Sequence, residues 1–394
     1  MTLPARRRPK AVVITALGIS QTLAWASSYY LLAILADPIA AALRVPRALV
    51  FGAFSMSLLI AAFLGPAVGR AIDRRGGRDV LALSSVVLAV GLCWLAVASG
   101  LISLFAAWVL LGVGQAMGLY NAGFATLTAL YDREARSAIT GITLIAGFAS
   151  TVSWPLSSLL NDAFGWRVAC LVWAALNLTI ALPLNRFVLP PAVPSARGQA
   201  ADVPVGWKPY REMLLLAFVF AVGWFVAGSM AAHLPRLLER AGATPIEAVA
   251  AAALVGPAQV AARLAEFVVL RRIHPLVSAR IATSLHPIGA AVLAVMGPPG
   301  ATLFVVLFGA GNGLLTIASG TVPLALFGPL GYGERTGLIT APARAAQAFA
   351  PVVFGLLLDR MGVGVIFVSA GLCLAALGAL LCLSASPSVG RGAG

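Results

Sequence analysis

Twelve long apolar stretches constrain this chain of 394 residues more than any other feature. A helix needs about twenty apolar residues to cross the hydrocarbon core of a bilayer, and these stretches are of that order. Backbone groups inside a bilayer must bond to one another, so each stretch is expected to form a helix. The stretches lie at residues 11–36, 48–71, 80–98, 102–130, 137–161, 166–187, 213–235, 248–270, 275–296, 301–327, 335–359 and 363–384. The sequence therefore predicts an all-α membrane protein with twelve transmembrane helices.

Charged residues are few, and most of them are basic. Hydrophobic residues make up 60% of the chain and charged residues 10%, with a net charge of +14. Such a charge can indicate nucleic-acid binding, but here the lysines and arginines lie in short segments between apolar stretches, where they orient a membrane protein. We therefore expect the lipid bilayer, and no nucleic acid, as the partner, and we expect a monomer.

The distribution of lysine and arginine predicts the orientation. If the N-terminus is inside, nineteen of them fall on the cytoplasmic side and six on the other. The start of the chain is similar to a secretory signal, with an A-x-A site at Ala24-Trp25-Ala26. The apolar stretch continues to Ala36, however, so an uncleaved first helix is expected. These features predict a multi-pass protein of the cytoplasmic (inner) membrane with both termini in the cytoplasm.

One long polar stretch divides the chain. Residues 188–212 hold five prolines and several charged residues, a composition typical of a linker. The sequence thus predicts an N-terminal six-helix bundle at 1–187 and a C-terminal six-helix bundle at 213–394.

The two halves share short patterns. The pair Gly112 and Gly114 recurs as Gly309 and Gly311, an offset of 197 residues. Small residues at such positions allow helices to pack closely. The shared order predicts two related bundles in a parallel repeat, with a substrate site between them near the middle of the membrane.

Charges are concentrated in the segment 69–79, between the second and third apolar stretches. It reads G-x-x-x-D-R-x-G-x-R, with four arginines and two aspartates in eleven residues. We expect Gly69 to allow close helix approach and Gly76 to permit a tight turn. The residues that carry the pattern are Gly69, Asp73, Arg74, Gly76 and Arg78.

This pattern resembles the loop between helices 2 and 3 of the major facilitator superfamily. The resemblance implies two six-helix bundles that work by alternating access, with these residues in the cytoplasmic gate. Asp73 is expected to meet the positive end of the helix that begins near residue 335 when that side is closed. Aligning Gly256 with Gly65 places Leu264 where Asp73 stands, so the second copy of the pattern has decayed.

Two arginines lie inside apolar stretches, where charge is costly and usually functional. Arg263 and Arg344 are expected at a similar depth, roughly 12–14 Å from the cytoplasmic surface, counting 1.5 Å per residue. Two guanidiniums suit a carboxylate, which each can bind with paired donors. The monocarboxylate and oxalate–formate type transporters carry basic residues in helices 8 and 11, and this chain is similar to them. Alternatively, Arg263 pairs with Glu266 and Arg344 extends to the cytoplasmic surface.

A proton carrier is harder to identify. The monocarboxylate type has an acid four residues before its helix 8 arginine, where this chain has Gln259. His286 and Glu266 are the remaining candidates for a coupling proton. A helix-packing role is the alternative for His286.

Several uncharged residues could contact a ligand in the cavity, and helix packing is the alternative for each of them. These are Trp25, Tyr29, Tyr30, Asn121, Asn312 and Gln347.

We predict a secondary transporter for a small organic anion, with a carboxylate as its substrate. An exporter of amphipathic drugs or metabolites is the alternative. An enzyme is not expected, because the sequence holds no H-E-x-x-H or G-x-S-x-G motif, and a non-transporting sensor is disfavoured too. No cofactor or metal is expected. The four cysteines lie in apolar stretches without metal-ligand spacing and are predicted to pack between helices.

Overall fold

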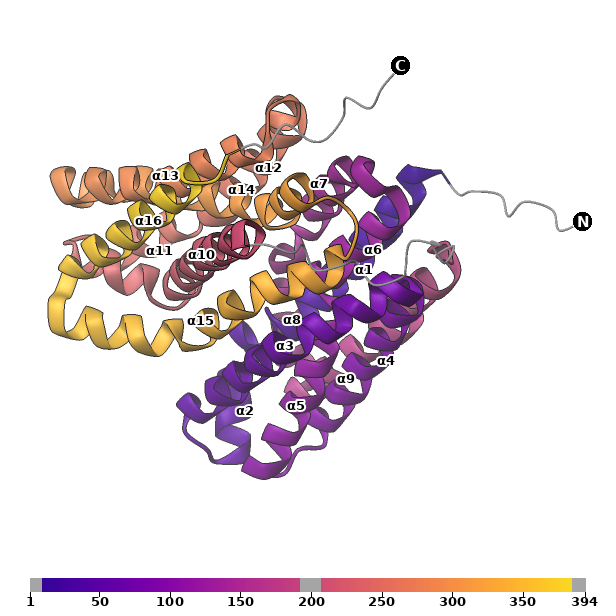
Figure 1. Cartoon of the computed structure of the whole chain (residues 1–394). Helices are drawn as coiled ribbons and strands as arrows, with labels where there is room; N and C mark the ends of the chain where they lie inside the picture. The colour runs from indigo at the N-terminus through magenta and orange to yellow at the C-terminus, as the bar shows by residue number, and fades with distance from the viewer. Residues whose placement is uncertain (1–8, 192–206, 385–394) are drawn as a thin grey trace, which may run out of the picture.

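The computed structural model describes residues 9–191 and 207–384, and the regular structure in these two ranges is helical (Figure 1). The predicted linker 188–212 falls largely between the two ranges and stays a prediction. The first bundle comprises α1 (Lys10–Ser28), α2 (Leu32–Leu43), α3 (Arg47–Arg75), α4 (Gly77–Ala96), α5 (Leu101–Gly118), α6 (Tyr120–Tyr131), α7 (Ala135–Ala146), α8 (Ala149–Phe164) and α9 (Trp166–Leu176). The second comprises α10 (Trp207–Arg240), α11 (Pro245–Ala252), α12 (Val255–Val268), α13 (Pro275–Met296), α14 (Ala301–Phe327), α15 (Tyr332–Met361) and α16 (Val365–Leu381).

The helices account for twelve membrane crossings. In the described residues, ten continuous helical stretches are long and apolar enough to span a bilayer. One of them, Leu101–Phe164, has 64 residues and would measure about 96 Å if straight, roughly twice the thickness of a bilayer. It and Tyr332–Leu381 each reverse direction at a short 3₁₀ turn and so cross twice. Ten stretches with two counted double give twelve, as predicted.

Four of the predicted helices are broken. The first is interrupted at Tyr29–Leu31, where the amides of Tyr29 and Tyr30 both donate to the carbonyl of Trp25 at 3.0 Å. The others break at Leu119, at Gly147–Phe148 and at Ala253–Leu254. Hydropathy does not detect such breaks, because apolar residues continue through them and nearby carbonyls still accept the freed amides.

The charged segment 69–79 is mostly helical, which corrects the expectation of a loop. Helix α3 runs to Arg75 and α4 begins at Gly77, so Gly76 alone joins them. Gly76 has φ 81° and ψ 162°, a conformation that glycine adopts at no steric cost. The tight turn expected at Gly76 is therefore present.

The paired glycines of the two halves make equivalent contacts. A Cβ at Gly112 of α5 would lie 2.8 Å from the carbonyl oxygen of Ser57 on α3. A Cβ at Gly309 of α14 would lie 2.8 Å from the carbonyl oxygen of Val255 on α12. Each glycine lets its helix approach a neighbouring backbone, in corresponding places of the two bundles.

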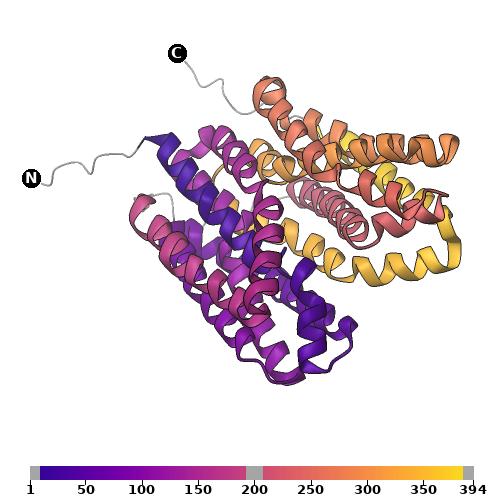
Figure 2. The same cartoon turned by 180° about the vertical axis from the view of Figure 1, so that it is seen from behind.

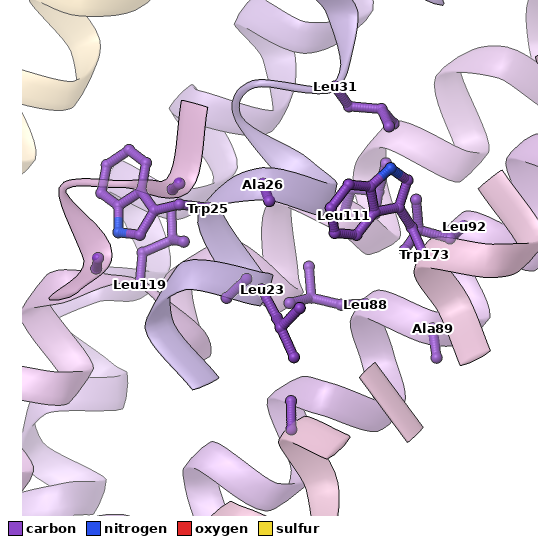
Figure 3. Packing of buried hydrophobic residues seen from close by; sticks show 14 of the residues in the cluster. Leu23, Trp25, Ala26, Leu31, Leu88, Ala89, Leu92, Leu111, Leu119 and Trp173 are labelled. Carbon is purple, nitrogen blue, oxygen red and sulfur yellow. The ribbon is translucent and has the colours of Figure 1, made fainter. Parts of the chain in front are cut away.

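Each bundle has its own hydrophobic core. Figure 3 shows part of the first, where Leu92 and Leu111 lie near Trp173, all fully buried. The indole N–H of Trp173 donates to Ser157 Oγ at 3.0 Å, which satisfies a polar atom inside the core. Cys170 and Cys373 are buried as expected, whereas Cys93 and Cys382 are exposed at the bundle surfaces, so the packing prediction is wrong for those two.

The bundles meet mainly through α3, α6 and α7 of the first and α12, α14 and α15 of the second. The start of α1, the turn between α3 and α4, the start of α15 and the end of α16 lie toward one end of the molecule, which we call the termini face (Figure 1). At the other end the tip of α2 and the turn between α15 and α16 diverge in both views (Figures 1 and 2). The bundles are thus joined at the termini face and spread at the opposite face.

Candidate functional site

Arg263 is buried on α12 and reaches into the first bundle. Its side chain is 5% exposed, and Nη1 donates to the carbonyl of Thr143 on α7 at 3.2 Å. Nη2 donates to Gln259 Oε1 at 3.4 Å, and the buried Nε has no partner. A Cβ at Gly147 would lie 2.3 Å from Nη1, so the glycine at the α7–α8 break makes room for this guanidinium.

Arg344 is buried on α15 and also faces the junction between the bundles. Its guanidinium carbon lies 5.5 Å from the ring centroid of Trp25 on α1 and 5.4 Å from that of Trp224 on α10. Nη1 donates to Gln347 Oε1 at 3.4 Å. Gln347 Nε2 in turn donates to the Tyr29 hydroxyl at 2.6 Å. Arg344 therefore does not extend to the termini face.

Neither arginine has an acidic partner in the part of the chain that the structure describes. Among the described residues, no carboxylate lies within 4.0 Å of either guanidinium. Glu266, the alternative partner of Arg263, lies 3.2 Å from Arg136 Nη2 and accepts from Ser278 Oγ at 2.8 Å. The alternative pairing of Arg263 with Glu266 is therefore absent.

An aromatic cluster lies beside both arginines. The Trp25 ring is 5.1 Å from that of Tyr29, 6.2 Å from Tyr30 and 4.8 Å from Tyr120. Arg344 lies over the Trp25 ring, and Arg263 reaches α7 in the bundle that carries these rings. The break at Tyr29–Leu31 is what places two consecutive tyrosines on this cluster.

Two residues of this site, Tyr120 and Trp224, were not expected from the sequence. An aromatic residue in an apolar helix gives no sign of which face it occupies relative to the other bundle. The break at Leu119, next to Tyr120, has an extended conformation that no sequence pattern indicated. A periodicity argument could have found neither.

The remaining polar candidates are placed differently. Asn121 Nδ2 donates to Thr340 Oγ1 on α15 at 2.6 Å and so bridges the bundles directly. Asn312 and His286 line a cavity of about 30 Å³ formed by α10, α13, α14 and α16 of the second bundle. His286 Nε2 lies 3.0 Å from Ser369 Oγ. The structure does not bring Asn312 or His286 into contact with the arginines.

The residues that the sequence predicts to form the gate lie at the termini face. Asp73 accepts hydrogen bonds from the amides of Gly333 (2.8 Å) and Glu334 (2.9 Å) in the first turn of α15. A Cβ at Gly69 would lie 2.0 Å from the Gly333 carbonyl oxygen, so the helices cross backbone against backbone. The expected contact of Asp73 with the positive helix end is present.

The other residues of the pattern lie around that contact. Arg70 Nη2 lies 3.2 Å from Glu334 Oε1 across the bundles. Arg78 Nε donates to Asp79 Oδ1 at 3.2 Å, and Arg74 is exposed.

The sequence profile described as "Major Facilitator Superfamily" matches residues 17–341. Human monocarboxylate transporter 11 is 30% identical over 331 residues, covering 80% of this chain and 63% of the relative. Rat monocarboxylate transporter 3 is 26% identical over 320 residues, covering 75% and 64%. The chain thus spans less than two thirds of the length of these curated relatives.

Solved structures show the same fold. The human organic anion transporter MFSD10 superimposes with a TM-score of 0.74 at 18% identity, covering 95% of this chain and all of that one. The proton:xylose symporter XylE gives 0.72 at 14% identity, with coverage of 95% and 96%.

Proposed function

This chain belongs to the major facilitator superfamily, and from that premise we propose that it is a secondary transporter of a small organic anion, with Arg263 and Arg344 binding the carboxylate. The similarity to monocarboxylate transporters supports the substrate class, and the family assignment argues against an enzyme. The observation that carries the proposal is the burial of two arginines without an acidic partner among the described residues.

Two uncompensated buried cations are costly, because burial removes the water that stabilises their charge. A carboxylate between the bundles compensates this cost. Two donors near the aromatic cluster can bind it, because neither Arg263 Nε nor Trp25 Nε1 has a hydrogen-bond partner within residues 9–191 and 207–384. Both are buried donors with no local acceptor, the arrangement that an anion would complete.

The two arginines also connect the site to both bundles. Both belong to the second bundle, yet Arg263 donates to Thr143 on α7, and Arg344 lies over Trp25 on α1. A carboxylate that draws either guanidinium toward itself therefore changes a contact between bundles. Such a differential contact is what allows a ligand to shift a conformational equilibrium.

The arrangement of the bundles supports a proposed transport cycle. Residues 1–187 and 213–394 are proposed to rock against each other about the linker 188–212. The termini face, closed by Asp73, is proposed to be cytoplasmic, in keeping with the excess of lysine and arginine on that side. The opposite face, where α2 and the turn between α15 and α16 diverge, is then the proposed entry to the site.

Ligand-dependent thermal stabilisation of the purified protein tests the proposal. Carboxylates, amines and drugs are compared, because a ligand that prefers the folded state raises the melting temperature. Carboxylates are expected to stabilise the wild type. Arg263→Ala and Arg344→Ala should each lower their affinity by about 30-fold to several thousand-fold, the effect of losing about 2–5 kcal/mol from a desolvated charge pair.

Lysine at either position should rescue only partly, since it lacks the planar fork of arginine. Arg236→Ala is the matched control, because Arg236 pairs with the exposed Asp359 away from the site. Stabilisation by drugs alone, or carboxylate binding that survives both alanine variants, would overturn the proposal in favour of apolar efflux.

A further inference from the structure

The aromatic cluster is larger than a small anion needs. From Trp25, Tyr29 and Tyr30 it continues through further rings of the first bundle. Tyr29 lies 5.4 Å from Phe54, Phe54 lies 5.5 Å from Trp108, and Tyr30 lies 6.3 Å from Trp154. Every neighbouring pair falls within the range of favourable aromatic contacts, so the rings form one connected set, which we call the wall. The wall consists of Trp25, Tyr29, Tyr30, Phe54, Trp108 and Trp154.

This wall and the charges lie on different bundles. Arg263 and Arg344 come from the second bundle, whereas the rings of the wall come from the first. Trp224 on α10 adds an indole from the second bundle, beside Arg344. A ligand between the bundles thus meets cationic donors on one side and aromatic faces and edges on the other.

The contacts of Arg344 join these two features. The guanidinium lies over the rings of Trp25 and Trp224, which stabilise its charge through cation–π attraction. Trp25 carries a buried Nε1 donor without a partner, within a side chain that is only 3% exposed. An acceptor bound to Arg344 is therefore next to an aromatic ring that also offers a hydrogen bond.

We propose that the anion bound here is an aromatic carboxylate, an acid group attached directly or through one or two methylenes to a planar ring. This inference rests on the proposed function and names its substrate class. The arginines hold the acid group, and the ring packs edge-to-face or offset between Trp25 with its neighbouring tyrosines on the first bundle and Trp224 on the second. A short aliphatic acid satisfies the arginines but leaves the wall unused.

The quadrupole of an aromatic ligand ring favours its binding to other rings beyond what its buried apolar area contributes, so aromatic acids are preferred over saturated ones. Each well-placed aromatic pair is worth about 0.5–1.5 kcal/mol beyond its buried area. Two such pairs predict an affinity about 5- to 150-fold higher for an aromatic acid than for a saturated acid of the same size. Benzoate and cyclohexanecarboxylate have the same charge and the same number of carbon atoms, so the ratio of their affinities measures the contribution of ring–ring contacts.

Binding of these two acids to the purified full-length protein is measured by calorimetry, with acetate as a third probe. Benzoate is expected to bind at least about 5-fold more tightly than cyclohexanecarboxylate. Trp25→Leu and Trp224→Leu should each reduce this ratio toward one. Trp25→Leu should also weaken the binding of both acids, because it removes the Nε1 donor, and the ratio cancels that common loss. Trp94→Leu is the matched control, because Trp94 is 45% exposed on α4 and bonds Ser103.

The ratio is measured within each folded variant, so a loss of stability does not imitate the expected result. Equal affinity for the two acids, with loss of both in Arg344→Ala, overturns the aromatic preference and leaves the anion transporter intact. A preference for benzoate that persists in both leucine variants also overturns the proposal, because groups other than these tryptophans would then bind the ring. Failure of all carboxylates to bind removes the proposed function and this inference together.

Discussion

Arg136 and Glu266 join the two bundles at the termini face, on the other side of the junction from Asp73. Arg136 Nη2 lies 3.2 Å from Glu266 Oε1, and Nη1 donates to the carbonyl of Ile273 at 2.7 Å. The pair α7–α12 corresponds by the internal repeat to the pair α3–α15. In the second bundle Leu264 stands at the position of Asp73 and cannot bind the facing helix. Glu266, two residues later, makes the contact between bundles instead, through its ion pair with Arg136. The two bundles are thus joined at two places, by a carboxylate bonded to backbone amides at Asp73 and by an ion pair at Glu266.

The first prediction concerns this ion pair. Glu266→Gln removes the charge that compensates Arg136 and weakens a buried hydrogen bond, at a cost of about 1.5–3 kcal/mol. The termini face should open more often, which distance measurements between spin labels at residues 137 and 267 would detect. Glu134→Gln is the control, because Glu134 is 87% exposed. An unchanged distance distribution in Glu266→Gln would show that the pair does not hold the face closed.

The second prediction concerns Asp73. Asp73→Asn turns an amide donor toward one of the two α15 amides and loses the interaction of a full charge with the helix end. Closure at the termini face should weaken and transport should slow, while the protein still folds. Asp79→Asn is the control, because the ion-pair partners of Asp79 among the described residues, Arg78 and Arg186, belong to its own bundle. Unchanged transport and unchanged state populations in Asp73→Asn would contradict the assignment.

The third prediction compares two glycines on α3. A Cβ at Gly69 would lie 2.0 Å from a backbone oxygen of α15, whereas at Gly65 the nearest atom would be 3.9 Å away. Gly69→Ala should therefore force the helices apart and lower the melting temperature by several degrees, because backbone cannot move aside as a side chain can. Gly65→Ala should be nearly neutral. Equal melting temperatures for the two variants would show that the crossing is looser than described.

The fourth prediction concerns pH and His274, which precedes α13. Its Nδ1 accepts from the amide of Leu276 at 3.2 Å, and burial, with Arg136 and Arg280 nearby, lowers the pKa of its imidazole below 6.5. The unfolded chain therefore binds this proton more readily than the folded one. Stability should be full above about pH 6.5 and fall as the pH drops through the folded pKa.

Melting temperatures of the wild type between pH 7.5 and 5 measure this effect. Asn is also a good helix cap, so His274→Asn should keep the cap and give a flatter profile. The same slope in both proteins would mean that other groups carry the pH dependence.

The sequence predicted the crossings, the charged pattern and the buried arginines, since each depends on local composition. It did not predict where helices break, because a break at Tyr29 or Leu119 leaves hydropathy unchanged. It also left the partner of Glu266 open, because Arg136 lies 130 residues away and no local pattern connects them. Contacts between bundles depend on how two complete folds meet, which the periodicity of one helix does not encode.

The glycine-lined crossing of α3 and α15 has a mechanical consequence. Most helix pairs interlock through side chains that act as knobs and fix how far one helix can slide along the other. Gly69 and Gly333 present no knobs, so this crossing gives little steric resistance to axial slip or rotation. The axial position of α3 along α15 is therefore set by the two hydrogen bonds that Asp73 accepts, and breaking them leaves the helices free to slide.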